Sequence, residues 1–98
     1  MNIKKTITDT KMELVLEGRL DTNTSPQLEA EIKGDINSIT LLDIDLSDLA
    51  YISSAGLRVL LSAQKIMNRQ GEMIIRNVND DIMDVFEVTG FVDILNIE

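Results

Sequence analysis

The sequence predicts an α/β fold: one domain over residues 1–98, with a mixed sheet of four to five strands and helices mainly on one face. Short apolar runs alternate with segments of helical periodicity, which predicts parallel strands joined by right-handed crossovers. The first two apolar runs are separated only by a short turn at residues 9–11, which adds one antiparallel pair. The predicted order is β-β-α-β-α-β-α.

Two strands are expected at the N-terminal end, over residues 3–8 and 12–18. In the second of these, Met12, Leu14 and Leu16 recur at a period of two and share one face. A glycine at residue 18 interrupts the pattern and indicates a bulge or the end of the strand.

The first helix is expected to begin within residues 24–26 and to end at Gly34. Two caps fit its start. Ser25 can cap the helix with Pro26 at the first helical position, or Thr24 can cap it with a glutamine three residues on.

The central strand is expected over residues 39–46. Leu42, Ile44 and Leu46 point one way, whereas Leu41, Asp43 and Asp45 point the other way, so helices should cover only the face without the two aspartates. These two aspartates and Asp48 also raise the possibility of a magnesium site. A solvated sheet face is favoured, because no ordered ligand set or phosphate loop accompanies them.

The second helix is expected from Leu57 to about Gln70, with Gly71 ending it. A short strand should follow over residues 73–76, and residues 92–97 should form a last short strand or an irregular tail. The buried face of the second helix is expected to consist of Val59, Leu60, Ala63, Ile66 and Met67.

The third helix is expected to begin after Asn79 or Asp80 and to end in a C-cap around Gly90. Phe91 should fold back onto the helix. Its inward-facing side chains should be Ile82, Val85 and Phe86.

Composition excludes several kinds of chemistry. The chain has no cysteine and no histidine, which removes disulfides, thiolate metal sites and a Ser-His-Asp triad. A net charge of −8 disfavours direct binding to nucleic acid or to an anionic membrane. No apolar run approaches the roughly 18 residues of a membrane span. We therefore expect a soluble, cytoplasmic protein that is not an enzyme and that has no metal or cofactor.

The candidate site is the pair Ser53-Ser54, where the central strand meets the second helix. A serine there lies beside the unpaired N–H groups of the first helical turn, a favourable place for a phosphate. The simpler alternative is a serine that only caps the helix. A hydrolase with a serine nucleophile is disfavoured, because no histidine or nearby lysine is present to act as its base.

An ordered set of motifs extends along the chain. They are Glu17-Gly18-Arg19-Leu20-Asp21 and residues 42–47, 51–61, 71–75 and 88–91. Together they resemble the STAS domain in its free-standing bacterial form, the anti-sigma factor antagonist. The resemblance covers nearly the whole chain.

The resemblance implies a binding switch. In that family the unphosphorylated antagonist binds an anti-sigma factor that is also a serine kinase, and this binding releases a sigma factor. The kinase phosphorylates one serine of the antagonist and so ends the interaction, and a metal-dependent serine phosphatase reverses the step. The alternative function is a STAS adaptor or small-ligand-sensing subunit of a larger signalling or transport complex, without phosphorylation.

The family's pattern at the switch is Asp-Ser-Ser/Thr-Gly-Leu, with the first hydroxyl as the phosphate acceptor. Alignment on Gly56-Leu57 puts the acceptor at Ser54. Here Ser53 replaces the aspartate and Ala55 replaces the second hydroxyl residue, so Ser53 stays the alternative acceptor. Ser54 is favoured because it is expected to lie nearer the helix N-cap.

A second element of the family, Gly-x-Leu-Asp, maps onto residues 18–21, so the resemblance implies that Asp21 faces the kinase. Its simpler role is to lie near the helix dipole or to close an Asx-turn with Asn23. Arg58 begins an exposed basic stripe with Lys65 and Arg69, and it either borders the docking surface or is only solvated. The expected partner-binding residues are Asp21, Asn23, Thr24, Ser53, Ser54, Gly56, Leu57 and Arg58.

Overall fold

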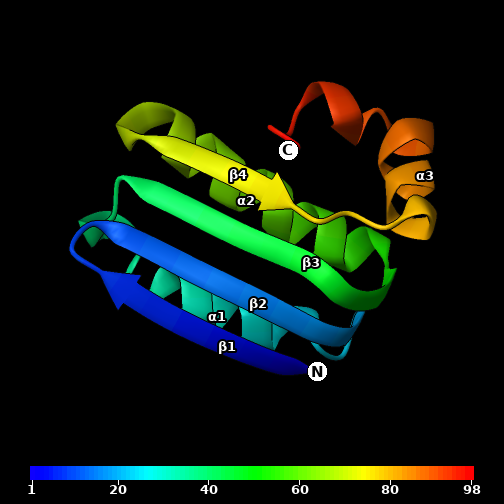
Figure 1. The fold of residues 1–98 in the computed structure, drawn as a ribbon, viewed down its shortest axis with the longest axis horizontal. Coiled ribbons are helices and arrows are strands. Elements are labelled where there is room, and N and C mark those ends of the chain that lie inside the picture. Colours follow the sequence, from blue (N-terminus) through cyan, green and yellow to red (C-terminus); the bar gives the residue numbers. More distant parts are fainter.

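The computed structural model describes all residues from 1 to 98 and contains four strands and three α-helices (Figure 1). Short 3₁₀ turns occur at Ile36–Ser38 and Phe91–Asp93. In chain order the main elements are β1 (Asn2–Thr8), β2 (Lys11–Leu20), α1 (Ser25–Lys33), β3 (Leu41–Ile52), α2 (Ser54–Gln70), β4 (Glu72–Arg76) and α3 (Asp80–Thr89).

The sheet has the order β1-β2-β3-β4. β1 pairs with β2 antiparallel, whereas β2–β3 and β3–β4 are parallel pairs, each joined by a crossover helix. α1 and α2 lie on one face of the sheet, and α3 lies beyond the ends of β3 and β4 (Figure 1). The predicted mixed sheet and element order are therefore confirmed.

The core lies between the inner face of the sheet and α1 and α2. Side chains that alternate along β2 and β3 are fully buried there, as the period of two predicts. On α2 the predicted apolar face is confirmed for Val59, Leu60, Ala63 and Met67, whereas Ile66 is half-buried. Burying each such side chain contributes about 1.5–3 kcal/mol. None of the helices is both long enough and apolar enough to cross a membrane.

The two central strands extend further than the sequence predicts. β2 continues through Gly18 to Leu20, and β3 runs from Leu41 to Ile52 instead of covering residues 39–46. Ser47 and Asp48 interrupt the apolar alternation, but the backbone pairing continues to the Leu20–Ile52 pair. The register shifts after Gly18, whose φ of +108° fits the predicted bulge.

The open face of the sheet is less solvated than predicted. Asp43 is only 5% exposed, and its Oδ2 lies 2.7 Å from Nη2 of Arg76 on β4. The expectation of a solvated carboxylate is thus wrong for Asp43, because a side chain of the neighbouring strand covers it. Asp45 is half-buried, and it accepts hydrogen bonds from the Ser47 N–H (2.8 Å) and the Asn77 amide (3.0 Å).

The ends of α1 and α3 follow the predicted signals, and α2 ends at the predicted Gly71, but α2 starts earlier than predicted. Thr24 is the N-cap residue of α1, but its side chain does not bond the first turn of that helix. Asn79 caps α3, since its side chain accepts a hydrogen bond of 2.9 Å from the Ile82 N–H. Gly90 ends α3 with a φ of +80°. The tail is mostly irregular, with one isolated parallel bridge from Ile97 to β4.

Candidate partner-binding edge

Two loops meet at one edge of the sheet because β2 and β3 are parallel and end side by side. The Ser53 N–H, directly after β3, donates a hydrogen bond of 2.9 Å to the carbonyl of Leu20 at the end of β2. This bond fixes the spacing between the loop at residues 21–24 and the N-cap and first turn of α2 at residues 53–58. We call these two segments the loop edge.

The Asp21 loop is held by its own side chains. Asp21 Oδ1 accepts from the backbone N–H groups of Asn23 (3.0 Å) and Thr24 (3.1 Å), which forms an Asx-turn. The Thr24 hydroxyl accepts from the Asp21 N–H (2.9 Å) and donates to the carbonyl of Arg19 (2.8 Å). The Thr24 N–H bond is the main reason that the pKa of Asp21 lies below its ordinary value, with smaller contributions from Asn23 and Arg19. Asp21 is therefore a fixed anion.

Ser53, and not Ser54, occupies the N-cap position of α2, and Ser54 is the first residue of the helix. The helix thus starts three residues before the predicted Leu57, and the expectation that Ser54 lies nearer the cap is wrong. The two hydroxyls also differ in accessibility. Ser54 is exposed, whereas Ser53 is half-buried and its Oγ is buried without a hydrogen-bond partner.

The positive end of α2 is not neutralised by the protein. The side chain of Ser53 makes no capping hydrogen bond, and the first turn of the helix contains no acidic residue. The first backbone bond of the helix runs from the Leu57 N–H to the carbonyl of Ser53 (3.0 Å), so the N–H groups before it lack helical acceptors. An anion placed on Ser54 would meet favourable charge there.

Gly56 and Leu57 are buried, so they position α2 without offering side chains to a partner. A Cβ atom on Gly56 would lie 2.7 Å from Cγ of Leu20 and 2.9 Å from Cγ1 of Ile52. Glycine is therefore required where the first turn of α2 packs on the ends of β2 and β3. The predicted contact residues that are exposed are Asn23, Ser54 and Arg58; Asp21, Thr24 and Ser53 are half-buried.

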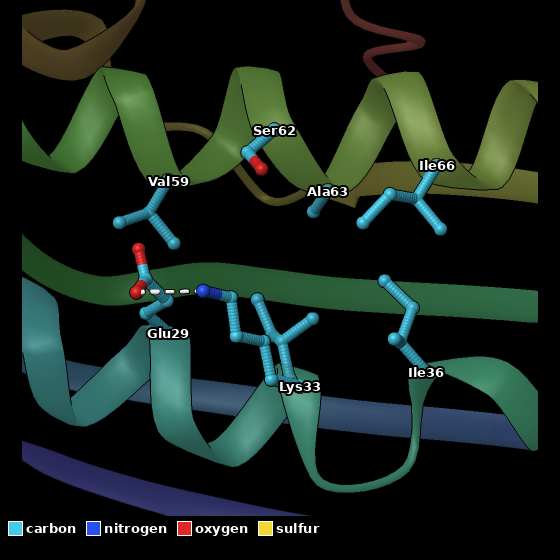
Figure 2. A pocket seen from close by; sticks show the side chains of 8 residues that line it. Glu29, Lys33, Ile36, Val59, Ser62, Ala63 and Ile66 are labelled. Carbon is cyan, nitrogen blue, oxygen red and sulfur yellow. Dashed lines mark hydrogen bonds and ion pairs between the residues drawn. The ribbon is translucent and has the colours of Figure 1, made fainter.

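An open groove of about 310 Å³ lies between the first turns of α1 and α2. Deeper between these helices only a small cleft of about 20 Å³ is left, where Val59, Ala63 and Ile66 face α1 and the Glu29–Lys33 ion pair (3.1 Å) lies along its rim (Figure 2). A space of that size holds no more than about one water. The wider groove is lined by Thr22, Ser25, Pro26, Glu29, Ala55, Arg58 and Val59.

Sequence reasoning gave no role to one further pair at the loop edge. The guanidinium of Arg19 lies 4.2 Å from the ring centroid of Tyr51, a residue that is 40% exposed. The Nε atom of Arg19 lies 3.9 Å from Asp21 Oδ2. Arg19 and Tyr51 are register partners on β2 and β3. The predicted strands stopped before both residues, so the pairing that would have revealed them was not visible in the sequence.

Comparisons with known proteins agree with this architecture. The chain matches the STAS domain family over residues 2–98. BtrV of Bordetella bronchiseptica is 38% identical over 81 residues, which cover 81% of this chain and 70% of that protein. The anti-sigma-B factor antagonist of Listeria monocytogenes is 30% identical over 100% of this chain and 87% of its own length.

Two solved structures share the fold at low sequence identity. An anti-sigma factor antagonist from Mycobacterium paratuberculosis has a TM-score of 0.87 and 21% identity, covering 98% of this chain and 83% of that one. The Bacillus cell fate determinant SpoIIAA in its phosphorylated form has a TM-score of 0.79 and 20% identity, and the match covers 99% of this chain and 91% of that one. With the family match over nearly its full length, the chain belongs to the STAS domain family.

Proposed function

We propose that this protein is an anti-sigma factor antagonist that binds a serine-kinase anti-sigma factor through the loop edge and is released when that kinase phosphorylates Ser54. Binding of the kinase frees a sigma factor, and a serine phosphatase restores the unmodified antagonist. The observation that carries the proposal is the exposed Ser54 at the uncompensated N-terminus of α2, joined to the Asp21 loop through the Ser53–Leu20 hydrogen bond.

The relatives support the partner class. The Listeria relative is named an anti-sigma-B factor antagonist, and SpoIIAA has been solved in a phosphorylated form. In this chain Ser54 is the accessible member of the serine pair, which favours it over Ser53 as the acceptor.

Phosphate on Ser54 would act on the partner and leave the fold in place. It adds a charge of about −1.5 to −2 and three acceptor oxygens. At the first residue of α2 this charge is favourable within the domain. A partner surface that fits a hydroxyl and the fixed Asp21 anion would instead meet extra bulk and charge. A loss of about 3 kcal/mol of binding free energy corresponds to roughly 100-fold in affinity and is sufficient for a switch.

The test measures binding and phosphorylation together with the purified cognate kinase. We expect Ser54→Ala to bind the kinase with ATP present and to accept no phosphate, while Ser54→Asp binds roughly 100-fold more weakly. Ser53→Ala is the matched control and should still be phosphorylated at Ser54, as phosphopeptide mass spectrometry reads out directly.

Three results would count against the proposal. Equal affinities of Ser54→Ala and Ser54→Asp would remove the switch from this position. Phosphorylation of the Ser54→Ala protein would move the acceptor to Ser53. A stable complex with other subunits that does not respond to ATP would favour the adaptor function instead.

A further inference from the structure

The outward face of α2 carries a stripe of exposed polar and basic side chains that starts at Ser54. Its members recur at intervals of four, four, three and four residues, so at about 100° per residue they fall within roughly 80° of arc. All of them are exposed. We call this set the α2 stripe; it consists of Ser54, Arg58, Ser62, Lys65 and Arg69.

The cations of this stripe are free, in contrast to most others in the protein. Of the nine lysines and arginines, five form ion pairs with acidic side chains, which leaves four. Three of those four are Arg58, Lys65 and Arg69; the fourth is Lys4 on β1. α2 contains no acidic residue, so it carries +3 in a chain of −8 and the remainder carries −11.

The helix dipole does not account for the whole stripe. A cation in the last turn is favoured by the negative end of the helix, which fits Arg69. Arg58 lies in the N-terminal part of α2, where the dipole gives a cation no advantage. Glu29 lines the same groove as Arg58, but its carboxylate is bonded to Lys33. None of the ion pairs in the structure involves Arg58, Lys65 or Arg69.

We propose that the α2 stripe docks an acidic face of the partner protein, so that binding extends from the loop edge along the length of α2. The inference rests on the proposed function, because it assigns a charge to the surface of the same partner. At 1.5 Å per residue, the stripe from Ser54 to Arg69 is about 22 Å long. Complementary charge of this kind chiefly raises the rate of association.

The position of Ser54 at one end of the stripe links docking to the switch. A phosphate there lies about one helical turn from Arg58, well within the roughly 8 Å Debye length at physiological salt. It therefore neutralises Arg58 and repels an acidic partner directly. Lys65 and Arg69 lie beyond that length and keep their charge, so modification of Ser54 and loss of these two cations should weaken binding independently.

The experiment measures the association rate constant with the purified cognate kinase by stopped flow at 0.05 M and 0.3 M salt. The double variant Lys65→Glu/Arg69→Glu should associate about tenfold more slowly at low salt and show a flatter salt dependence. The association rate constant of the neutral variant Lys65→Gln/Arg69→Gln should lie between those of the double glutamate variant and the unmodified protein. Lys4→Glu is the matched control, because it reverses the other free cation without touching α2, and it should leave the rate unchanged. Circular dichroism melts confirm that each variant is folded.

Unchanged association and salt dependence in both stripe variants would overturn the inference, as would faster association. An equal loss in the Lys4→Glu control would also overturn it, because the effect would then come from net charge and not from the stripe. Ser54→Asp is measured in parallel. If it weakens binding while the stripe variants do not, the switch stands and only the acidic docking face is excluded.

Discussion

At the scale of single residues, the loop edge depends on close packing more than on reactive groups. Gly56 has room for a hydrogen only, because a Cβ would come within 2.7 Å of Leu20, which is itself fully buried. Asp21 is fixed by backbone N–H groups, and Ser53 is tied to the end of β2 by its own N–H. Of the two serines only Ser54 is exposed, as the proposed role of phosphate acceptor requires.

We predict that Gly56→Ala destabilises the protein by about 1–3 kcal/mol, because the added methyl group must displace Leu20 and Ile52 from a packed position. The free energy of unfolding, measured by urea denaturation, checks this. Gly34→Ala is a matched control, since its Cβ would meet only a carbonyl oxygen at 3.5 Å. Similar stabilities of the two variants would show that α2 is not seated in the way described.

At the scale of elements, the two helix starts after β3 and β4 differ in a way that predicts opposite responses. Asn79 caps α3 through the Ile82 N–H, and its amide also donates to the carbonyl of Leu49 (2.8 Å). Ser53 occupies the N-cap position of α2 but makes no side-chain bond there. Its buried hydroxyl costs free energy because no partner replaces water.

We therefore predict that Asn79→Ala lowers the free energy of unfolding by about 1–2 kcal/mol, through loss of the cap. Ser53→Ala should change it by less than about 0.5 kcal/mol or stabilise the protein slightly, since it removes an unpaired buried oxygen. Thermal and urea unfolding of the two variants check this. A large loss in Ser53→Ala would mean that its hydroxyl has a partner in solution.

Element types were predictable from the sequence because periodicity and turn residues agree, but several boundaries were not. The first apolar residue of the helical pattern predicts that α2 starts at Leu57, whereas the cap lies four residues earlier at Ser53. Likewise, the polar residues Ser47 and Asp48 predict that β3 ends at Leu46, whereas the strand continues to Ile52. Polar residues continue a strand when its neighbour supplies the backbone bonds, and a single sequence does not show that neighbour.

At the scale of the whole molecule, the topology was predictable for a different reason. A helix between two strands forces a right-handed parallel crossover, and a short turn forces a hairpin. These rules brought the loops after β2 and β3 to one edge, so the candidate site could be assembled before its geometry was known. Burial of charge was not predictable in this way, because Asp43 is covered by Arg76, a residue 33 positions later on β4.

Charge also determines how the stability of the folded molecule depends on pH. The pKa of Asp45 is affected most by partial burial, which raises it, but bonds from Ser47 and Asn77 together hold the pKa below its ordinary 3.8. The Lys11 ammonium lowers the pKa of Glu13 below 4.5. In contrast, bonds to Asp35 and Glu31 raise the pKa of Lys5 above 10.5. The carboxylates therefore stabilise the fold above their unfolded pKa values, and Lys5 does so below 10.5.

Asp45 provides a direct test of this pH dependence, because Ser47 and Asn77 are its hydrogen-bond partners. The lowered pKa of Asp45 means that the folded state binds fewer protons than the unfolded state. The contribution of Asp45 to the free energy of unfolding is therefore complete above about pH 5, and it is lost as the pH falls through the pKa of Asp45 in the folded state. Asp45→Asn should therefore be less stable than the unmodified protein at pH 7, and the gap should shrink as the pH is lowered toward 3. Urea denaturation of both proteins at each pH measures this gap, and the difference between them cancels the general repulsion of a chain with a charge of −8. The same comparison with Lys5→Met should give a gap that is constant from about pH 7 to about pH 10 and closes above it. A gap for Asp45→Asn that widens on acidification would show that its hydrogen bonds do not favour the carboxylate.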